Sequence, residues 1–165
     1  MNRTRLLTIM AVFIAVGTIT AQLIWFPAGV AKAYPMQHAI NVMAGVLLGP
    51  GPAVIIAFMI SLLRVMLGLG TLLAFPGSMV GAFLAGYLYQ KTKTPGLAAV
   101  GEGVGTGIIG ALVAVPFAAI FMGSSAGAFA FIPPFLVSSI SGSLIGWLLV
   151  VQIKKIEAIQ FDFNK

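Results

Sequence analysis

The chain of 165 residues contains no cysteine and very few charged residues. The lack of cysteine excludes disulfides and any metal site built on thiolates. Only 7% of the residues are charged and 60% are hydrophobic, whereas soluble domains carry roughly a quarter of charged residues. Three acidic residues stand against nine lysines and arginines, for a net charge of +6. This composition predicts an integral membrane protein whose basic residues set its topology, and not a nucleic-acid binder.

Motifs for energy conversion and metal binding are also missing. The sequence has no GxxxxGKS or GxxxxGKT loop, so it cannot hydrolyse ATP by that route. It has no HExxH, no Cys/His cluster and no DxDxDG loop, so we predict neither a metal site nor a cofactor. His38 and Ser78 could pair in an intramembrane hydrolase, but no third orienting group accompanies them. We therefore predict that the protein is not an enzyme and keep the hydrolase as an alternative.

Six apolar runs, separated by segments rich in glycine, proline or lysine, fill most of the chain. A helix needs about 20 apolar residues to cross a hydrocarbon core ~30 Å thick. The first run has 21 residues, longer than the roughly 7–15 of a signal peptide, so we expect it to remain as a helix. We predict an all-α membrane protein with one domain over residues 1–165 and helices at residues 6–26, 34–48, 53–67, 72–89, 97–122 and 128–151.

The charges decide between six helices and five. Runs 34–48 and 53–67 are short, but Pro50 and Pro52 between them indicate a turn and not one continuous helix. With six helices and a cytoplasmic N-terminus, the basic residues at both ends and at Lys91 and Lys93 all lie inside the cell, as the positive-inside rule requires. Merging the two runs breaks that rule. We therefore predict that both termini are cytoplasmic.

This topology gathers polar and aromatic side chains in the outward halves of the helices. His38 and Asn41 are three residues apart and share a helix face. Hydrogen-bonding groups beside aromatic rings favour a pocket for a small, uncharged or weakly charged aromatic ring. The candidate substrate-binding residues are Trp25, Tyr34, Gln37, His38, Asn41, Arg64, Phe75, Ser78, Phe131, Phe135, Ser138 and Ser139. The loops at residues 27–34 and 123–127 are candidate lids.

Each of these residues also has a simpler interpretation. His38 could cap a helix, Arg64 could reach the outer interface, and the serines could bond to their own helix. Glu102 is expected near the cytoplasmic edge, where it complements the N-terminus of its own helix. A proton-coupled carrier would instead bury carboxylates near the middle of the membrane, so this expectation weighs against one.

Particular segments of the chain resemble a known family. Ala11 and Ala15 form a small-xxx-small pair on the first helix, and residues 37–42 (QHAINV), 71–79 (TLLAFPGSM) and 101–107 (GEGVGTG) carry the rest of the likeness. With these features the chain resembles the S component, the substrate-binding membrane subunit, of an energy-coupling-factor (ECF) transporter. It is similar to the ThiW type, which is associated with hydroxyethylthiazole, the thiazole precursor of thiamine.

The resemblance implies a high-affinity capture subunit of an ATP-driven vitamin-precursor importer in the plasma membrane of a prokaryote. Ala11 and Ala15 would dock on a transmembrane scaffold, the T component, which is shared with two ATPase subunits. The S component would then topple in the lipid bilayer to release a thiazole alcohol inside. Three alternatives stay open: an S component for another thiamine-related or small aromatic vitamin, the intramembrane hydrolase, and a structural membrane protein without a ligand.

Overall fold

Prolines fix the first turn of three helices, because proline is pre-organised for that position and lacks only an N–H that has no partner there. The structure, a computed structural model, describes residues 1–28 and 31–155. The helices that begin with proline are α2 (Pro35–Leu48), α3 (Pro50–Met66) and α5 (Pro95–Val104). The short link between α2 and α3 turns at Gly49, whose φ of 87° favours glycine.

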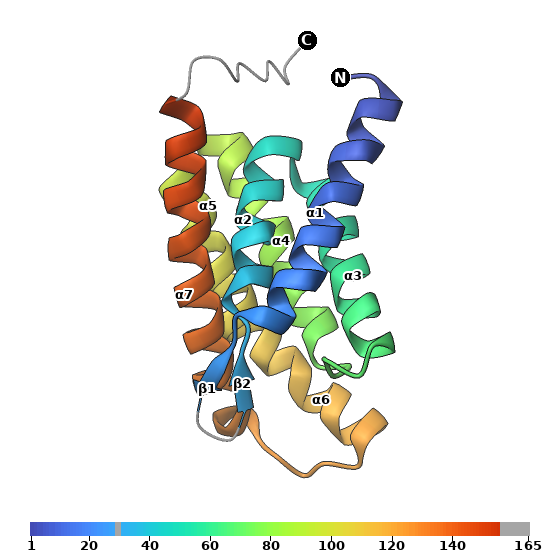
Figure 1. Cartoon of the computed structure of the whole chain (residues 1–165). Coiled ribbons are helices and arrows are strands. Elements are labelled where there is room, and N and C mark those ends of the chain that lie inside the picture. Colours follow the sequence, from blue (N-terminus) through green and yellow to red (C-terminus); the bar gives the residue numbers. More distant parts are fainter. Residues whose placement is uncertain (29–30, 156–165) are drawn as a thin grey trace.

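The remaining helices complete a bundle of antiparallel rods (Figure 1). They are α1 (Arg3–Leu23), α4 (Ala74–Thr92), α6 (Ala111–Met122) and α7 (Ala128–Lys155). A π-helix, η1 (Gly105–Gly110), joins α5 directly to α6, so these three elements form one rod over residues 95–122. In the described part of the chain the helices therefore make six rods.

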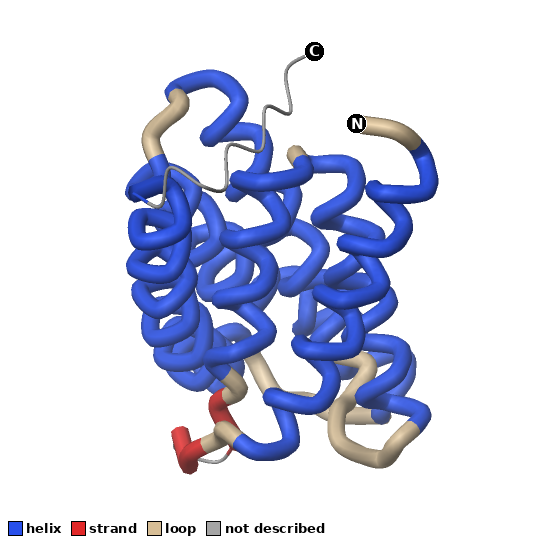
Figure 2. Tube along the Cα trace, turned by 45° about the horizontal axis from the view of Figure 1, so that its top comes forward, coloured by secondary structure: helices blue, strands red, loops and turns tan. Residues whose placement is uncertain are grey.

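The start of α1 and the end of α7 lie at the same end of the bundle, and a β-hairpin lies at the opposite end (Figures 1 and 2). The basic residues follow this division. Lys93 and Lys154 both approach the ring of Tyr89, at 5.9 and 4.4 Å from its centroid, so the α4–α5 turn and the end of α7 are neighbours. Lys32 lies in the hairpin at the other end. The two ends of the bundle thus differ strongly in charge.

Helix α2 is the central element. Ten of its fourteen residues are buried, and it packs against α1, α3, α4, α5 and α7. Ile40 and Ala44 join a core cluster with Ile56 and Ile60 of α3, whereas Val42 and Val46 pack toward Val150 of α7. Since its neighbours shield it from lipid, α2 can carry polar side chains inside the bundle.

Close contact between backbones sets the position of the α5–η1–α6 rod. A Cβ atom on Gly105 of η1 would lie 2.7 Å from the Cα atom of Gly81 in α4. A Cβ on Gly45 of α2 would lie 2.7 Å from the backbone nitrogen of Gly86, also in α4. Small residues at such crossings let helices approach closely in lipid. Helix α4 is therefore held tightly between α2 and the rod.

The end of the first helix differs from the sequence prediction. Helix α1 ends at Leu23, whereas we expected it to continue to Phe26. A hairpin of β1 (Phe26–Ala28) and β2 (Ala31–Ala33) follows, with Phe26 opposite Ala33. Pro27 ends the helical run because it supplies no backbone donor. The hairpin packs against α7, and it occupies part of the segment that we expected to be a lid.

Three helical segments in the described residues are long and apolar enough to cross a membrane: Arg3–Leu23, Pro95–Met122 and Ala128–Lys155. Pro50–Met66 is apolar but shorter. At about 1.5 Å per residue, the 14 residues of α2 extend only about 21 Å. The prediction of an all-α membrane protein is confirmed at this level.

Candidate functional site

A buried network of polar side chains crosses the interior of the bundle from the hairpin end toward its middle. Its members come from α2, α3, α4, α5 and η1, and all of them are buried: Gln37, His38, Asn41, Ser61, Arg64, Ser78, Glu102 and Thr106. Five of these, namely Gln37, His38, Asn41, Arg64 and Ser78, are among the candidate residues from the sequence. Polar groups buried in a membrane protein are costly and usually serve a function.

Arg64 begins the network at the hairpin end. Its Nη1 donates to Oε1 of Gln37, and its Nη2 donates to the carbonyl oxygen of Leu69 at 3.1 Å. The ring of Tyr34 lies 3.9 Å from the guanidinium carbon, a favourable cation–π geometry. Arg64 is 3% exposed, so its guanidinium does not reach the interface as the simpler interpretation required. It is held inside the protein by neutral acceptors and an aromatic face.

Hydrogen bonds from Gln37 and Asn41 connect α2 to α4. Nε2 of Gln37 donates to Oγ of Ser61 at 3.0 Å and of Ser78 at 2.8 Å. Nδ2 of Asn41 lies 3.0 Å from the same Ser78 hydroxyl and 3.2 Å from the Ser78 carbonyl oxygen. Ser78 thus connects two amide side chains one helical turn apart on α2. This position leaves it bonded to amides and not to the imidazole that a hydrolytic Ser–His pair would need.

Glu102 ends the network near the middle of the bundle. Its Oε1 lies 2.7 Å from Nδ1 of His38, 3.1 Å from Nδ2 of Asn41 and 2.9 Å from Oγ1 of Thr106. The shared contact confirms that His38 and Asn41 lie on one face of α2. The contact with His38 gives the depth of Glu102 in the bundle. Gly142 lies near the midpoint of α7, and a Cβ on Gly142 would lie 2.6 Å from Cβ of His38.

The expectation for Glu102 was wrong. It does not complement the N-terminus of its helix, because α5 begins at Pro95 and Glu102 lies in its third turn. It is completely buried, and its Oε1 contacts a histidine from another helix. The sequence contained a signal for this role, since Glu102 is one of only three acidic residues and lies within an apolar run. Ser61 and Thr106 were missed as well, because single hydroxyls in apolar helices are common.

Two of the predicted serines border the network. Oγ of Ser138 in α7 accepts from the backbone nitrogen of Tyr34 at 2.8 Å, which ties the end of the hairpin to α7. Oγ of Ser139 lies 3.3 Å from the carbonyl oxygens of Gly103 and Leu136. Ser139 therefore bonds in part to its own helix, as the simpler interpretation held. Both hydroxyls face protein and not lipid.

The predicted aromatic residues divide into two groups. The ring of Phe135 packs on α4, where a Cβ at Gly77 would lie 3.1 Å from its Cε1, and Phe131 lies 6.4 Å from Phe135 between centroids. Phe75 is half-buried and makes an edge contact with Phe58 at 5.4 Å. Trp25 is different: it is 47% exposed and its ring lies 4.1 Å from Nζ of Lys32. The structure thus places Trp25 on the hairpin surface, apart from the network.

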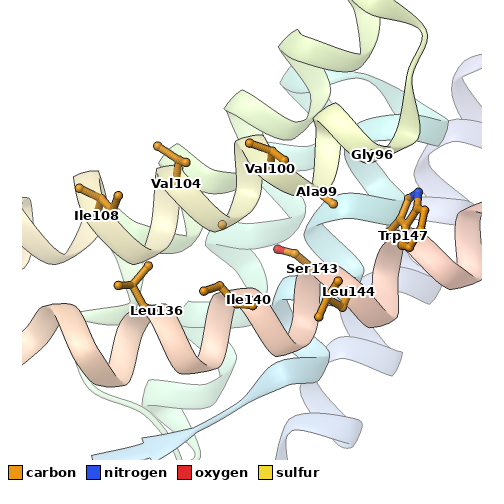
Figure 3. Close-up of a pocket in the computed structure, with 11 residues that line it drawn as sticks. Gly96, Ala99, Val100, Val104, Ile108, Leu136, Ile140, Ser143, Leu144 and Trp147 are labelled. Atoms are coloured by element: carbon orange, nitrogen blue, oxygen red, sulfur yellow. The ribbon is translucent and has the colours of Figure 1, made fainter.

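A separate apolar groove of about 420 Å³ lies between the α5–η1 segment and α7 (Figure 3). Its walls are almost entirely carbon, with Val104 and Ile108 facing Leu136 and Ile140 and with Trp147 at one end. Oγ of Ser143 is buried beside it and has no hydrogen-bond partner among the residues that the structure describes. None of the candidate substrate-binding residues lines this groove. It is an apolar feature of the bundle surface and not the polar site.

The apolar helices, the divided charge and the buried polar network define a multi-pass α-helical membrane protein with a polar interior. The sequence also matches a family model over residues 7–156, nearly the whole chain. The chain therefore belongs to the family described as thiamine-precursor transporter protein (ThiW). A comparison with curated proteins gave no match. Family membership confirms the resemblance found in the sequence and makes the protein a transporter of a thiamine precursor.

Proposed function

We propose that this chain is the S component of an ECF transporter and that it captures hydroxyethylthiazole from outside the cell. The observation that carries this proposal is the buried polar network, whose fixed hydrogen-bonding groups lie beside the rings of Tyr34 and Phe135 inside a transporter of the ThiW family. A small aromatic alcohol needs both features: a ring that packs on aromatic or apolar surfaces and a few oriented polar partners. The candidate residues from the sequence remain our proposal for the ligand contacts.

The proposed topology has six membrane spans with both termini in the cytoplasm of a prokaryotic cell. The six rods and the basic end of the bundle support it, because lysines and arginines near Tyr89 and at the start of α1 would then all be cytoplasmic. The shorter helices α2 and α3 fit this arrangement because much of their surface faces other helices and not lipid. The hairpin would lie at the outer surface, close to the proposed site.

The proposed partners are a T component and two ATPase subunits. Helix α1 packs against α2 and α3 on one side, and Ala11 and Ala15 are exposed on its free surface. Small side chains on an exposed membrane helix allow another helix to approach closely. We expect Ala11→Trp and Ala15→Trp to bind ligand normally but to lose uptake. Phe83→Trp, at an exposed position on α4, is the control, and normal uptake by the α1 variants would contradict the docking role.

A titration tests the substrate assignment. The purified protein is titrated with hydroxyethylthiazole, thiamine, a pyrimidine precursor and riboflavin. We expect tight binding of the thiazole alcohol only. Preferential binding of one of the other compounds would make the chain an S component for another vitamin. Equal, millimolar binding of all four would contradict the proposal and favour a structural protein without a ligand.

One observation favours a second candidate function, which is proton-coupled uptake of the same precursor by this chain alone. The sequence argument against it depended on Glu102 lying near the cytoplasmic edge, whereas Glu102 is buried deep in the bundle beside His38. Buried Glu–His pairs are typical of proton relays. Proteoliposomes with this chain alone decide the matter: uptake driven by a proton gradient supports the carrier, and uptake only with ATP and partner subunits supports the S component.

A further inference from the structure

The two nitrogens of the His38 ring have different surroundings. Nδ1 lies 2.7 Å from Oε1 of Glu102, which is 0% exposed. In the part of the chain that the structure describes, Nε2 has no hydrogen-bond partner. Nε2 is also not fully buried, because it is absent from the set of fully buried polar atoms that lack a partner. The His38 side chain retains 10% exposure. The ring is therefore anchored through one nitrogen and keeps the other available.

Glu102 is itself held in place, so it can orient the ring. Asn41 and Thr106 approach the same Oε1 from two other elements, at 3.1 and 2.9 Å. The carboxyl also lies against the backbone of α4, because a Cβ at Gly81 would lie only 2.7 Å from Cδ of Glu102. A carboxylate oxygen accepts hydrogen bonds, so the imidazole proton belongs on Nδ1. The bond made by one ring nitrogen sets the protonation of the other, which leaves Nε2 as an acceptor.

The charges of the network agree with this tautomer. The guanidinium of Arg64 and the carboxylate of Glu102 have opposite charges, and the neutral side chains of Gln37, Ser78 and Asn41 connect them. A neutral imidazole keeps the total charge at zero. A charged imidazole would leave one uncompensated positive charge inside the bundle, which is costly in a membrane protein.

We propose that Glu102 is a positioning residue that fixes His38 as the Nδ1–H tautomer, so that Nε2 accepts a hydrogen bond from the hydroxyl group of the substrate. This inference rests on the proposed function for the identity of the substrate. It adds a specificity rule: the site selects an uncharged alcohol. A ligand without the hydroxyl loses the hydrogen bond to Nε2. A phosphate ester instead places anionic oxygens next to Nε2, and because both are acceptors, no hydrogen bond forms between them.

The tautomer can be measured directly because His38 is the only histidine in the chain. The protein is labelled with ¹⁵N-histidine, purified through a tag that contains no histidine, and studied by NMR without ligand at neutral pH. We expect a protonated Nδ1 and an unprotonated Nε2. Glu102→Gln keeps an oxygen acceptor of the same length and should retain this pattern, whereas Glu102→Leu should shift the proton toward Nε2. An Nε2–H tautomer or a doubly protonated ring in the parent protein would overturn the inference.

The substrate part is tested in the parent protein with three ligands: hydroxyethylthiazole, the analogue with an ethyl group in place of the hydroxyethyl group, and the phosphate ester. Loss of one buried hydrogen bond should weaken binding of the ethyl analogue about five- to hundredfold, and the ester should bind more weakly still. Only the alcohol should shift the ¹⁵Nε2 signal. In His38→Leu, the alcohol and the ethyl analogue should bind equally.

The outcomes separate this inference from the proposed function. If the alcohol and the ethyl analogue bind the parent equally well, the role of Nε2 is wrong while thiazole capture stands. If neither binds, the substrate assignment fails and removes the hydroxyl contact with it. The ligand-free spectra of the parent and of the two Glu102 variants then still decide whether Glu102 sets the tautomer.

Discussion

Gly81 of α4 lies against Glu102, and replacing it with alanine is the sharpest test of the network. The new Cβ would lie 2.7 Å from Cδ of Glu102 and closer still to Oε2 of Glu102 and Oγ1 of Thr106. Glu102 cannot move aside freely, since His38, Asn41 and Thr106 all contact its Oε1. The substitution must therefore either strain the α4–η1 contact or break the hydrogen bonds of Glu102.

The magnitude follows from these two costs. Overpacking a tight contact destabilises by ~1–3 kcal/mol, and leaving a buried hydrogen-bonding group without its partner costs ~1–3 kcal/mol. Because either cost alone relieves the clash, we expect Gly81→Ala to lower the free energy of unfolding by about 1–3 kcal/mol and to weaken thiazole binding. The readouts are thermal unfolding in detergent and ligand titration at a temperature where the variant is folded.

Gly103→Ala is the matched control. Gly103 is also a helical glycine of this region, one residue from Glu102, but a Cβ there would meet nothing within 4 Å. Its replacement should be neutral or slightly stabilising, because alanine favours helix more than glycine does. Equal unfolding temperatures and equal affinities for the two variants would refute the close packing of Glu102 against α4.

Two further predictions concern Arg64 and the topology. Arg64→Lys keeps the charge, but lysine cannot donate to Gln37 and Leu69 with one planar group. Ligand affinity should therefore fall roughly five- to hundredfold in the same titration. Unchanged affinity would show that the Arg64 hydrogen bonds do not support ligand binding. Because the chain has no cysteine, single cysteines at residues 32, 93 and 154 can be labelled selectively. Membrane-impermeant reagents applied from outside should label only position 32, and labelling of 93 and 154 from opposite sides would contradict the proposed topology.

The apolar runs and their glycine and proline separators indicated the helical rods, but not where each helix begins. We expected helices from residues 53 and 97, whereas Pro50 and Pro95 already form the first turns of α3 and α5. These features are local, since proline and glycine act on the backbone at their own positions. The hairpin after Leu23 was missed because Trp25 and Phe26 continue the apolar run, and three-residue strands are too short to show an alternating pattern.

The site was harder to predict because it depends on contacts between helices. His38 and Asn41 could be placed on one face from their spacing alone. Glu102, the partner of that face, could not be identified from spacing, because its depth depends on how the α5–η1–α6 rod is shifted along α2 and α4. That shift is set by the glycine contacts between η1 and α4, which sequence spacing does not reveal. The family segment at residues 101–107 contains both the glutamate and one of these glycines, Gly105.

The central place of α2 has a consequence for how the protein is made. A segment of 14 residues that carries Gln37, His38 and Asn41 is a poor signal for insertion into a bilayer by itself, because polar side chains at the membrane centre oppose transfer into lipid. During synthesis α2 must therefore depend on neighbours that shield it. The apolar α3 follows after one residue, so the two can enter the bilayer together as a helical hairpin. The three polar side chains that we propose for recognition therefore also make the insertion of α2 depend on its neighbours.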